Sequence, residues 1–232
     1  MKLIRPFCAL LGTLALATAT LDAQTYTELG DAGQTLGTAQ NTGVVGGQTL
    51  NTVFGTIGTA GDADLFRITL NAPTTFSATT TFGGTTTLDT ALFLFNNLGQ
   101  AIYTNDDVSG SSLQSTLPGG TSFTMSLAAG TYYIAISLSG NEAINLNGQL
   151  LFAAYINGSS SSVRGAAAGV NPSTMSGFNG ATSFAETGAY RIDFTGTSTA
   201  VPEPSTTAFC FVAAGAAVVA VRRRRKSRSL SA

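Results

Sequence analysis

The stretch LDTALFLFNNLGQAIYTNDD, residues Leu88 to Asp107, decides the fold of this chain. Its first part, Leu88 to Phe95, carries apolar side chains on both faces of an extended strand, which is typical of a central strand covered on both sides. Asn96 to Gln100 has the Asn and Gly of a tight turn, and Ala101 to Thr104 returns. Residues 105–107 (NDD) close the hairpin. The stretch therefore predicts a β-hairpin at the centre of a sheet.

Short alternating segments on both sides of this hairpin predict further strands. Thr131 to Leu138 (TYYIAISL) is rich in aromatic and β-branched residues, which favour strands. In Asp62 to Leu70, apolar residues alternate with Arg67 and Thr69, which indicates a half-buried strand. The other predicted strands are Thr49 to Ile57, Phe76 to Phe82, Phe123 to Leu127, Leu150 to Ile156 and Ala189 to Thr195.

About eight to ten short strands predict an all-β fold, an antiparallel β-sandwich of the jelly-roll or immunoglobulin-like kind. The alternating pattern loosens between residues 139 and 188, where Asn-Gly pairs begin at Asn147, Asn157 and Asn179. We expect this region to be an elaborated loop region with at least one hairpin.

Three pieces of this pattern resemble a known family of domains. GDADLFRITL (Gly61 to Leu70), the opening stretch and AAGTYYIAIS (Ala128 to Ser137) are similar, in order and spacing, to the pre-peptidase C-terminal (PPC) type of β-sandwich. The resemblance implies a non-catalytic accessory domain of a secreted bacterial protein, and some members of that family bind calcium or polymers. No peptidase accompanies the domain here, so the domain itself would be the exported cargo.

The charge of the central region limits its function. Between Gln24 and Ala200 there are three basic residues (Arg67, Arg164 and Arg191) and ten acidic ones, which gives 3 − 10 = −7. A domain this acidic is not expected to bind nucleic acid. The chain has no His, and this region has no Cys and no Lys, which excludes disulfides and the usual nucleophile pairs. Two-carboxylate glycosidase chemistry stays open.

Acidic and amide side chains concentrate at the predicted strand ends, which suggests a Ca²⁺ site. Ca²⁺ binds six to eight oxygen ligands, and converging carboxylates favour a cation. If the Asp62 strand and the hairpin are neighbours, their side chains converge. The alternative, that Asp and Asn only cap turns, also stays open. The candidate ligands are Asp62, Asp64, Asp89, Asn105, Asp106 and Asp107.

Both ends of the chain have the composition of export signals. Residues 1–23 combine Lys2 and Arg5 with an apolar segment and small residues, which predicts a signal peptide with a helical core. Residues 24–200 are then the exported β-sandwich domain, and residues 201–232 form a C-terminal sorting and anchor segment.

That last segment, VPEPSTTAFCFVAAGAAVVAVRRRRKSRSLSA, has three parts. Residues 201–206 contain Pro202, Glu203 and Pro204. Residues 207–221 are mostly apolar and predict a transmembrane helix. The helix would be short, because its apolar run from Ala208 covers about 21 Å of a hydrocarbon core of about 30 Å. The tail 222–232 is basic, and positive charge stays cytoplasmic. The membrane-stop cluster is Arg222, Arg223, Arg224, Arg225 and Lys226.

The order of these parts resembles the PEP-CTERM sorting signal of bacteria that make extracellular polysaccharide. The resemblance implies recognition of Pro202, Glu203 and Pro204 by an exosortase, a membrane enzyme that cuts near the motif. The protein would cross the inner membrane, be anchored transiently through residues 207–221, and reach the cell surface or extracellular matrix.

We therefore expect a non-catalytic surface or matrix protein, associated with extracellular polysaccharide in a biofilm. Its partners would be the exosortase, the polysaccharide and, transiently, the membrane; the one expected cofactor is Ca²⁺. An alternative is a module that binds carbohydrate or ice, because Thr-rich runs occur at Thr79 to Thr81 and Thr85 to Thr87. A small carboxylate-dependent glycosidase is a distant third hypothesis.

Overall fold

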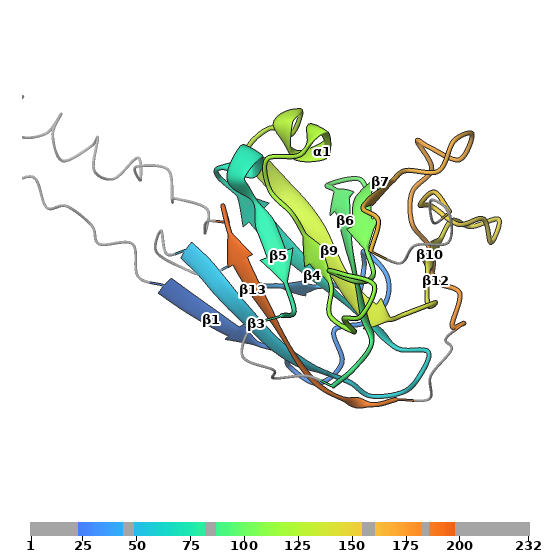
Figure 1. The fold of residues 1–232 in the computed structure, drawn as a ribbon, viewed down its shortest axis with the longest axis horizontal. Helices are drawn as coiled ribbons and strands as arrows, with labels where there is room; N and C mark the ends of the chain where they lie inside the picture. Colours follow the sequence, from blue (N-terminus) through green and yellow to red (C-terminus); the bar gives the residue numbers. More distant parts are fainter. Residues whose placement is uncertain (1–22, 44–48, 82–86, 155–160, 182–185, 198–232) are drawn as a thin grey trace, which may run out of the picture.

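The computed structural model describes residues 23–43, 49–81, 87–154, 161–181 and 186–197 of the 232-residue chain. These residues form two main β-sheets that pack on one another, together with one short α-helix (Figure 1). The prediction of a mostly β fold is confirmed. The predicted signal peptide, apart from Ala23, and the sorting segment lie outside the described residues. Ala23, predicted as the end of the signal peptide, is the first residue of strand β1.

The first sheet has five strands in the order β1-β3-β13-β5-β8. At its centre, β3 and β13 pair antiparallel from Gly188 opposite Ile57 to Asp193 opposite Thr52. The bounds of the strands are β1 Ala23–Thr27, β3 Thr49–Ile57, β5 Ser77–Thr79, β8 Thr116–Leu117 and β13 Gly188–Thr195.

The second sheet has six strands in the order β11-β7-β6-β9-β4-β2. Its long strands β4, β9, β6 and β7 pair antiparallel with one another. The bounds are β2 Gln40–Asn41, β4 Ala63–Leu70, β6 Thr90–Asn96, β7 Ala101–Asn105, β9 Gly130–Leu138 and β11 Arg164–Gly165. The predicted hairpin is confirmed as β6 and β7, which turn at Asn96 to Gln100.

Two strand pairs correct the prediction of a purely antiparallel sandwich. β1 pairs parallel with β3, and β2 pairs parallel with β4. After β1 the chain crosses to the second sheet, forms β2 there, and returns to the first sheet as β3. A crossover of this length lets two strands run in the same direction, which a tight hairpin cannot do.

The main core lies between the two sheets. Val53 and Ile192 from the first sheet and Phe66, Leu92 and Ile134 from the second are fully buried in it. Each side chain of this kind stabilises the fold by about 1.5–3 kcal/mol on burial. The alternation of apolar residues in β3, β4 and β9 thus directs one face of each sheet into a common core.

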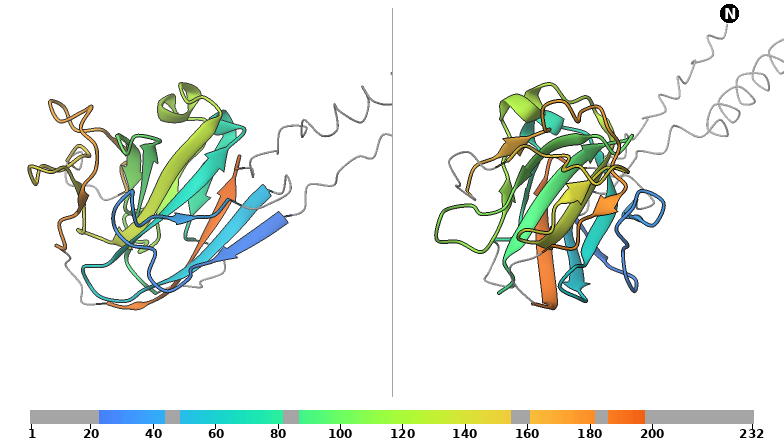
Figure 2. Two further views of the ribbon diagram at one scale, coloured as in Figure 1. Left: turned by 180° about the vertical axis from the view of Figure 1, so that it is seen from behind. Right: turned by 90° about the vertical axis from the view of Figure 1, so that its right-hand side faces the viewer.

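A second apolar cluster explains why β6 is apolar on both faces. Phe93 and Phe95 point away from the main core and pack against Phe152, with ring centroids 5.5 and 5.4 Å apart. Leu151 and Met175 complete the buried part of this cluster. The segment after β9 therefore covers the outer face of the six-stranded sheet, where it lies beside β6 and β7 in Figures 1 and 2.

That covering segment has less regular structure than predicted. The expected strand from Leu150 to Ile156 is wrong over its described residues, since Leu150 and Phe152 form only isolated bridges. Its backbone hydrogen bonds go to several partners, among them Ala143 and Gly165, instead of one adjacent strand. The short strands β10 (Ala143–Ile144) and β12 (Gly177–Phe178) pair antiparallel.

The expected hairpin in this region surrounds the turn Asn145 to Gln149, where Ile144 forms an antiparallel bridge with Leu150. This turn repeats the one between β6 and β7. In each, an Asn Oδ1 accepts hydrogen bonds from the backbone two and four residues later, and the Asn side chain donates to a Gln. Gly99 and Gly148 occupy the same position with φ of 75° and 72°.

The predicted strand Phe123 to Leu127 is also wrong, because Ser122–Met125 forms the short helix α1. Thr121 caps it: the Thr121 hydroxyl accepts from the Thr124 amide, and the Thr124 hydroxyl accepts from the Thr121 amide. Phe123 stacks on Tyr103. Local capping therefore overrides the alternating pattern. The 3₁₀ turn η1, Pro73–Thr75, precedes β5.

The two ends of the described domain meet at one end of β3. Ala23 is paired with Thr49, and the Thr197 hydroxyl donates a hydrogen bond to the Leu50 carbonyl. In Figure 1, β1 accordingly begins close to where β13 ends.

Candidate metal centre and sorting motif

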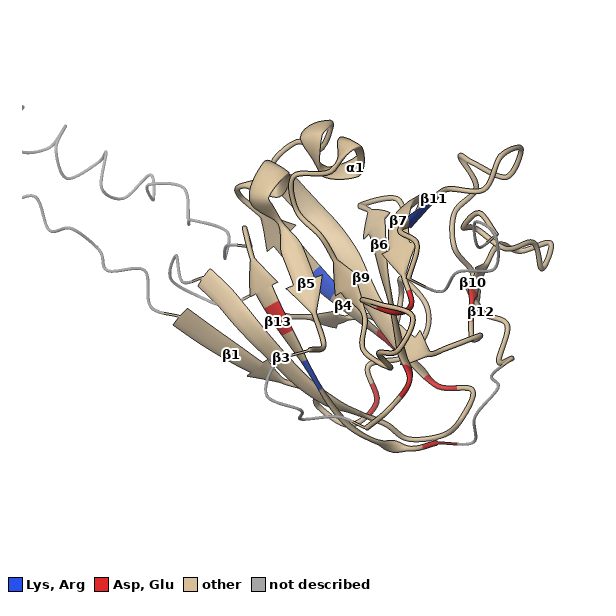
Figure 3. Cartoon of the chain, in the orientation of Figure 1, with Lys and Arg blue, Asp and Glu red and all other residues tan. Residues whose placement is uncertain are grey.

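Most of the acidic residues lie at the end of the sandwich away from the start of β1 (Figure 3). They come from the loop after β1, the start of β4, the segment before β6 and the loop after β7. The prediction that acidic side chains gather at strand ends is thus seen in the structure. Since β9 lies between β4 and β6, however, the Asp62 strand and the hairpin are not neighbours. The acidic residues therefore form two groups.

The first group is a candidate metal centre made by Glu28, Asp31 and Asp64. Each residue offers one carboxylate oxygen, and these three oxygens all lie within 4.8 Å of one another. Ligands on opposite sides of a Ca²⁺ ion, each bonded at about 2.4 Å, are separated by about that distance. The three side chains therefore fit a Ca²⁺ ion with room for further oxygen ligands.

Asp64 is the buried member of this metal centre, with no exposed surface. Its Oδ2 accepts a hydrogen bond of 2.7 Å from the hydroxyl of Tyr190. Its Oδ1 is buried and has no hydrogen-bond partner among the described residues. A buried carboxylate oxygen without a partner is costly. A cation beside it would remove that cost.

The electrostatics of Asp64 agree with this need for a positive partner. Burial, first of all, and the charges of Glu28 and Asp62 raise the pKa of the Asp64 carboxyl to about 8, against the lowering effect of the Tyr190 hydrogen bond. Burial and the Asp64 charge raise the pKa of Tyr190 as well, which keeps the phenol a donor. No positive side chain is among the causes of the Asp64 shift.

Backbone groups hold the other two ligands in place. Glu28 Oε1 accepts from the Ala32 amide at 2.9 Å, and Oε2 accepts from the Thr56 amide at 2.8 Å. Asp31 Oδ1 accepts from the Gly33 amide at 2.7 Å, while the residue is exposed. The candidate centre is thus anchored on one side and open to solvent on the other.

Gly55 on β3 leaves the space that this arrangement needs. A Cβ atom at position 55 would lie 2.2 Å from the Tyr190 hydroxyl and 2.6 Å from Glu28 Oε2. A larger residue would therefore displace two of the groups that surround Asp64.

The second acidic group contains three of the predicted ligands, Asp89, Asp106 and Asp107, and adds Glu186. Burial, and after it the charges of Asp106, Asp107 and Glu186, together raise the pKa of Asp89 to about 6. Asp89 Oδ1 is buried and has no hydrogen-bond partner among the described residues. Like charges thus approach one another here too.

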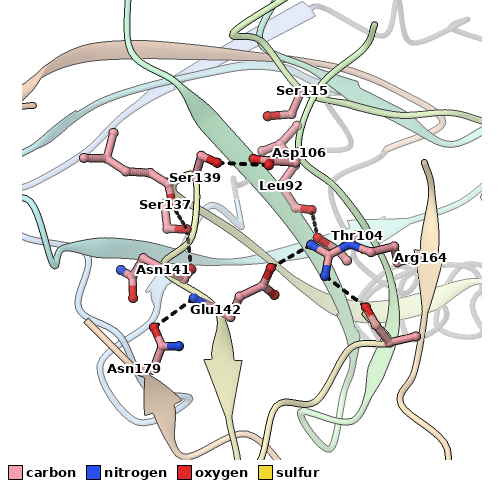
Figure 4. A network of polar contacts seen from close by, with 12 residues as sticks. Leu92, Thr104, Asp106, Ser115, Ser137, Ser139, Asn141, Glu142, Arg164 and Asn179 are labelled. Carbon is pink, nitrogen blue, oxygen red and sulfur yellow. Dashed lines mark hydrogen bonds and ion pairs between the residues drawn. The ribbon is translucent and has the colours of Figure 1, made fainter. Parts of the chain in front are cut away.

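Other groups bind part of this second acidic group. Ser139 donates its backbone N–H to the Asp89 carbonyl and its hydroxyl to Asp106 Oδ2, as Figure 4 shows for the latter. The Asn105 amide is fully used: its oxygen accepts from the Thr116 backbone, and its nitrogen donates to the carbonyls of Asp107 and Ser161. Asn105 therefore supports the loop structurally.

Near the second acidic group lies a buried ion pair. Arg164 Nη2 and Glu142 Oε1 are 2.7 Å apart, and the side chains are 3% and 10% exposed (Figure 4). Arg164 also donates to the Ala153 carbonyl, and the Glu142 backbone bonds to Asn179. The pair ties together parts of the segment that covers the six-stranded sheet.

The sequence identified part of these groups. Asp64 lies in the candidate metal centre, whereas Asp62 uses Oδ2 to accept from the Gly58 amide. Glu28, Asp31 and Glu186 were missed, because each is far in sequence from the residues it approaches. One signal was available: Glu28 and Asp31 are the first acids after the predicted signal peptide.

Comparison with known protein families assigns the end of the chain. Residues 200–225 match the family described as the PEP-CTERM protein-sorting motif. The match supports this chain being a PEP-CTERM protein, and the motif implies exosortase-dependent sorting to the cell surface after export and transient anchoring. No curated protein matches the chain.

The matched region contains the predicted motif Pro202, Glu203 and Pro204 and the arginines Arg222 to Arg225. These residues and Lys226 lie outside the described residues. Within the part of the chain that the structure describes, no helix is long and apolar enough to cross a membrane. The resemblance of the central region to the PPC type is supported by no family match and remains a prediction.

Proposed function

We propose that the protein is a non-catalytic component of the cell surface or extracellular matrix, where it associates with extracellular polysaccharide. The observation that carries the proposal is the sorting motif at residues 200–225. In this proposal the exosortase cuts near Glu203 and detaches the domain from its anchor.

The positions of the chain ends support a domain that is held by its tail during sorting. Thr197 is fixed to Leu50 on β3, and only three residues separate it from Val201. The six residues 198–203, which lead from Thr197 to Glu203, span at most about 21 Å when fully extended. Glu203 can therefore lie no further than about 21 Å from the end of the sandwich where β1 begins, which is the end away from most of the acidic residues.

The chemistry of the carboxylates supports a non-catalytic role. Asp64 has no exposed surface, and both oxygens of Glu28 accept backbone hydrogen bonds. A glycosidase needs two carboxyl groups that reach a sugar from either side. The carboxylates of the candidate metal centre serve a stabilising ion better than a substrate.

In the proposed function, Ca²⁺ bound by Glu28, Asp31 and Asp64 stabilises the exported domain. The domain has no disulfide to stabilise it, since residues 24–200 lack Cys. An ion here would join the loop after β1 to β4, and thus the N-terminal segment to the second sheet.

Replacement of Glu203 tests the sorting step. In producing cells, Glu203→Gln should leave the protein in the inner membrane with its tail intact, whereas the matched change Glu186→Gln, within the exported domain, should leave processing unchanged. Fractionation and immunoblotting of both variants measure this. Normal release of Glu203→Gln would contradict the proposal.

A further inference from the structure

The outer face of the five-stranded sheet carries a row of polar side chains, four threonines and Asp193, that crosses all five strands; we call it the hydroxyl row. The pairing registers place Thr25 beside Thr52, Thr52 beside Asp193, Asp193 beside Thr79, and Thr79 beside Thr116. The alternate residues of the same strands, such as Val53, Ile192 and Leu117, are buried in the main core. The row therefore faces outward.

The groups in the row are held in place by one another. The Thr52 hydroxyl donates to Asp193 Oδ1 at 2.9 Å, and the hydroxyls of Thr79 and Thr116 are 2.7 Å apart. Thr81 extends the row from Thr79 at 2.9 Å. Fixed side chains lose little entropy when a ligand binds them.

An aromatic ring lies next to this row. Phe54 is 38% exposed and is the register partner of both Thr27 and Arg191. The Arg191 guanidinium lies 5.5 Å from the centre of the Phe54 ring and also binds Asp193 Oδ1, at 2.7 Å. The face thus combines a hydroxyl row with an apolar ring, and Asp193 and Arg191 on it form an ion pair.

The two outer faces of the sandwich differ in how much of each is covered by other parts of the chain. The apolar cluster around Phe93 and Phe152 covers part of the six-stranded sheet. On the five-stranded sheet, Thr25, Thr27 and Thr195 are exposed. Among the described residues, the hydroxyl row is therefore a face that a long ligand can reach.

We propose that this face, with Thr25, Phe54, Thr79, Thr116 and Asp193 as its accessible residues and the 7% exposed Thr52 holding Asp193 in place, binds a neutral polysaccharide chain. The inference rests on the proposed function and gives its polysaccharide a binding surface. Hydroxyl groups both donate and accept, as sugar hydroxyls do, and an exposed ring provides an apolar surface for a sugar. With strands about 4.8 Å apart, the row spans about 19 Å, the length of a short oligosaccharide.

Charge selects a neutral polysaccharide over an acidic one. Asp193 compensates Arg191 on the face itself, and the exported domain carries 3 − 10 = −7 overall. An acidic polymer would be repelled by this field. An ice surface fits less well than sugar, because the hydroxyls already bond to one another and an ion pair lies among them.

The experiment compares two cross-strand threonine pairs that lie on the two opposite outer faces of the sandwich. Thr79→Val with Thr116→Val removes the two hydroxyls at the β5 and β8 end of the row. The control, Thr69→Val with Thr131→Val, removes an equally half-buried cross-strand pair from the outer face of the six-stranded sheet. Binding of the full-length chain, in a detergent without a sugar headgroup, is measured on cellulose, agarose and polygalacturonate.

We expect the wild type and the control pair to bind a neutral polymer, cellulose or agarose, equally and to bind polygalacturonate weakly. The Thr79 and Thr116 pair should lose at least about tenfold in affinity, the equivalent of about 1.4 kcal/mol. Equal binding by both pairs, absence of neutral-polymer binding by the wild type, or inhibition of ice recrystallisation without glycan binding would overturn the inference. Processing at the PEP motif is scored in parallel, so that a failed binding face is distinguished from a failed sorting function.

Discussion

The hydroxyl of Tyr190 on β13 donates a hydrogen bond of 2.7 Å to Oδ2 of Asp64 on β4, across the interface of the two sheets. Both residues are buried. The bond satisfies one oxygen of Asp64 and leaves Oδ1 without a partner among the described residues, in the company of the Glu28 and Asp31 carboxylates. The packing of the core thus places Asp64, whose raised pKa of about 8 favours the protonated form, beside two further carboxylates, where a cation could replace the proton.

Calcium should therefore raise the melting temperature of the domain. At a concentration about 100 times the Kd, a ligand stabilises the fold by about 2.7 kcal/mol, which corresponds to roughly 5–10 °C for a domain of this size. We expect Asp31→Asn to lose most of this shift, because Asp31 is exposed and its change should leave the fold intact. Thermal unfolding of the full-length chain with Ca²⁺ and with chelator measures it.

The control for this prediction is Asp89→Asn, which alters the second acidic group and should keep the full shift. Loss of the shift in Asp89→Asn but not in Asp31→Asn would place the ion at the second group. A wild type that melts equally with Ca²⁺ and with chelator would show that neither group binds the ion.

The second acidic group should make stability depend on pH. Burial and then Asp106 raise the pKa of Asp89 from its ordinary 3.8 to about 6. The folded state therefore holds this proton more tightly, and the stabilisation is present below about pH 4 and lost as the pH rises through about 6. Asp89→Asn should raise the melting temperature in chelator at pH 7 by a few degrees and lower this pH dependence. An unchanged pH profile would contradict the assignment.

Two ion pairs between described residues, Arg164 with Glu142 and Arg191 with Asp193, have the same length but different burial, which predicts different energies. Glu142→Gln leaves the 3% exposed Arg164 side chain without its carboxylate and should cost about 3 kcal/mol or more. Asp193→Asn affects a pair whose side chains are 23% and 20% exposed, and should cost at most about 1 kcal/mol. Denaturant unfolding of both variants measures the two losses in unfolding free energy. Equal losses would show that burial does not determine the contribution of an ion pair to stability.

The two matching turns offer a similar comparison. At Gly99 a Cβ atom would lie 2.6 Å from Leu36 Cδ1, whereas at Gly148 nothing lies within 4 Å. Both have positive φ, so Ala costs about 1 kcal/mol at either site. Gly99→Ala should cost about 1–3 kcal/mol more than Gly148→Ala, because the methyl overpacks Leu36. Equal melting temperatures for the two variants would show that Leu36 moves aside freely.

Local patterns predicted the long strands because their residues alternate against one core. Thr49–Ile57 was predicted with the bounds that the structure shows, and β9 within one residue. Helix α1 was missed because its reciprocal Thr121 and Thr124 cap outweighs three alternating apolar residues. The covering segment was read as loops since its apolar residues, such as Phe152, pack singly against β6.

The sites depended on contacts that a linear pattern does not contain. Asp64 was recognised as a candidate ligand, but Glu28 and Asp31 reach it only because β1 pairs parallel with β3 and the next loop crosses to the second sheet. The hydroxyl row likewise takes its members from five separate strands. Of the residues in the row, only Thr79 and Thr81 belong to a Thr-rich run of the sequence. The second run, from Thr85, lies mostly outside the described residues.

The most direct test of the central claim is the intact mass of the protein recovered from the cell surface and medium of producing cells. Sorting through the motif predicts a chain that ends near Glu203 and lacks the apolar segment and the arginine cluster. An extracellular protein that still carries the tail to Ala232 would contradict exosortase-dependent release.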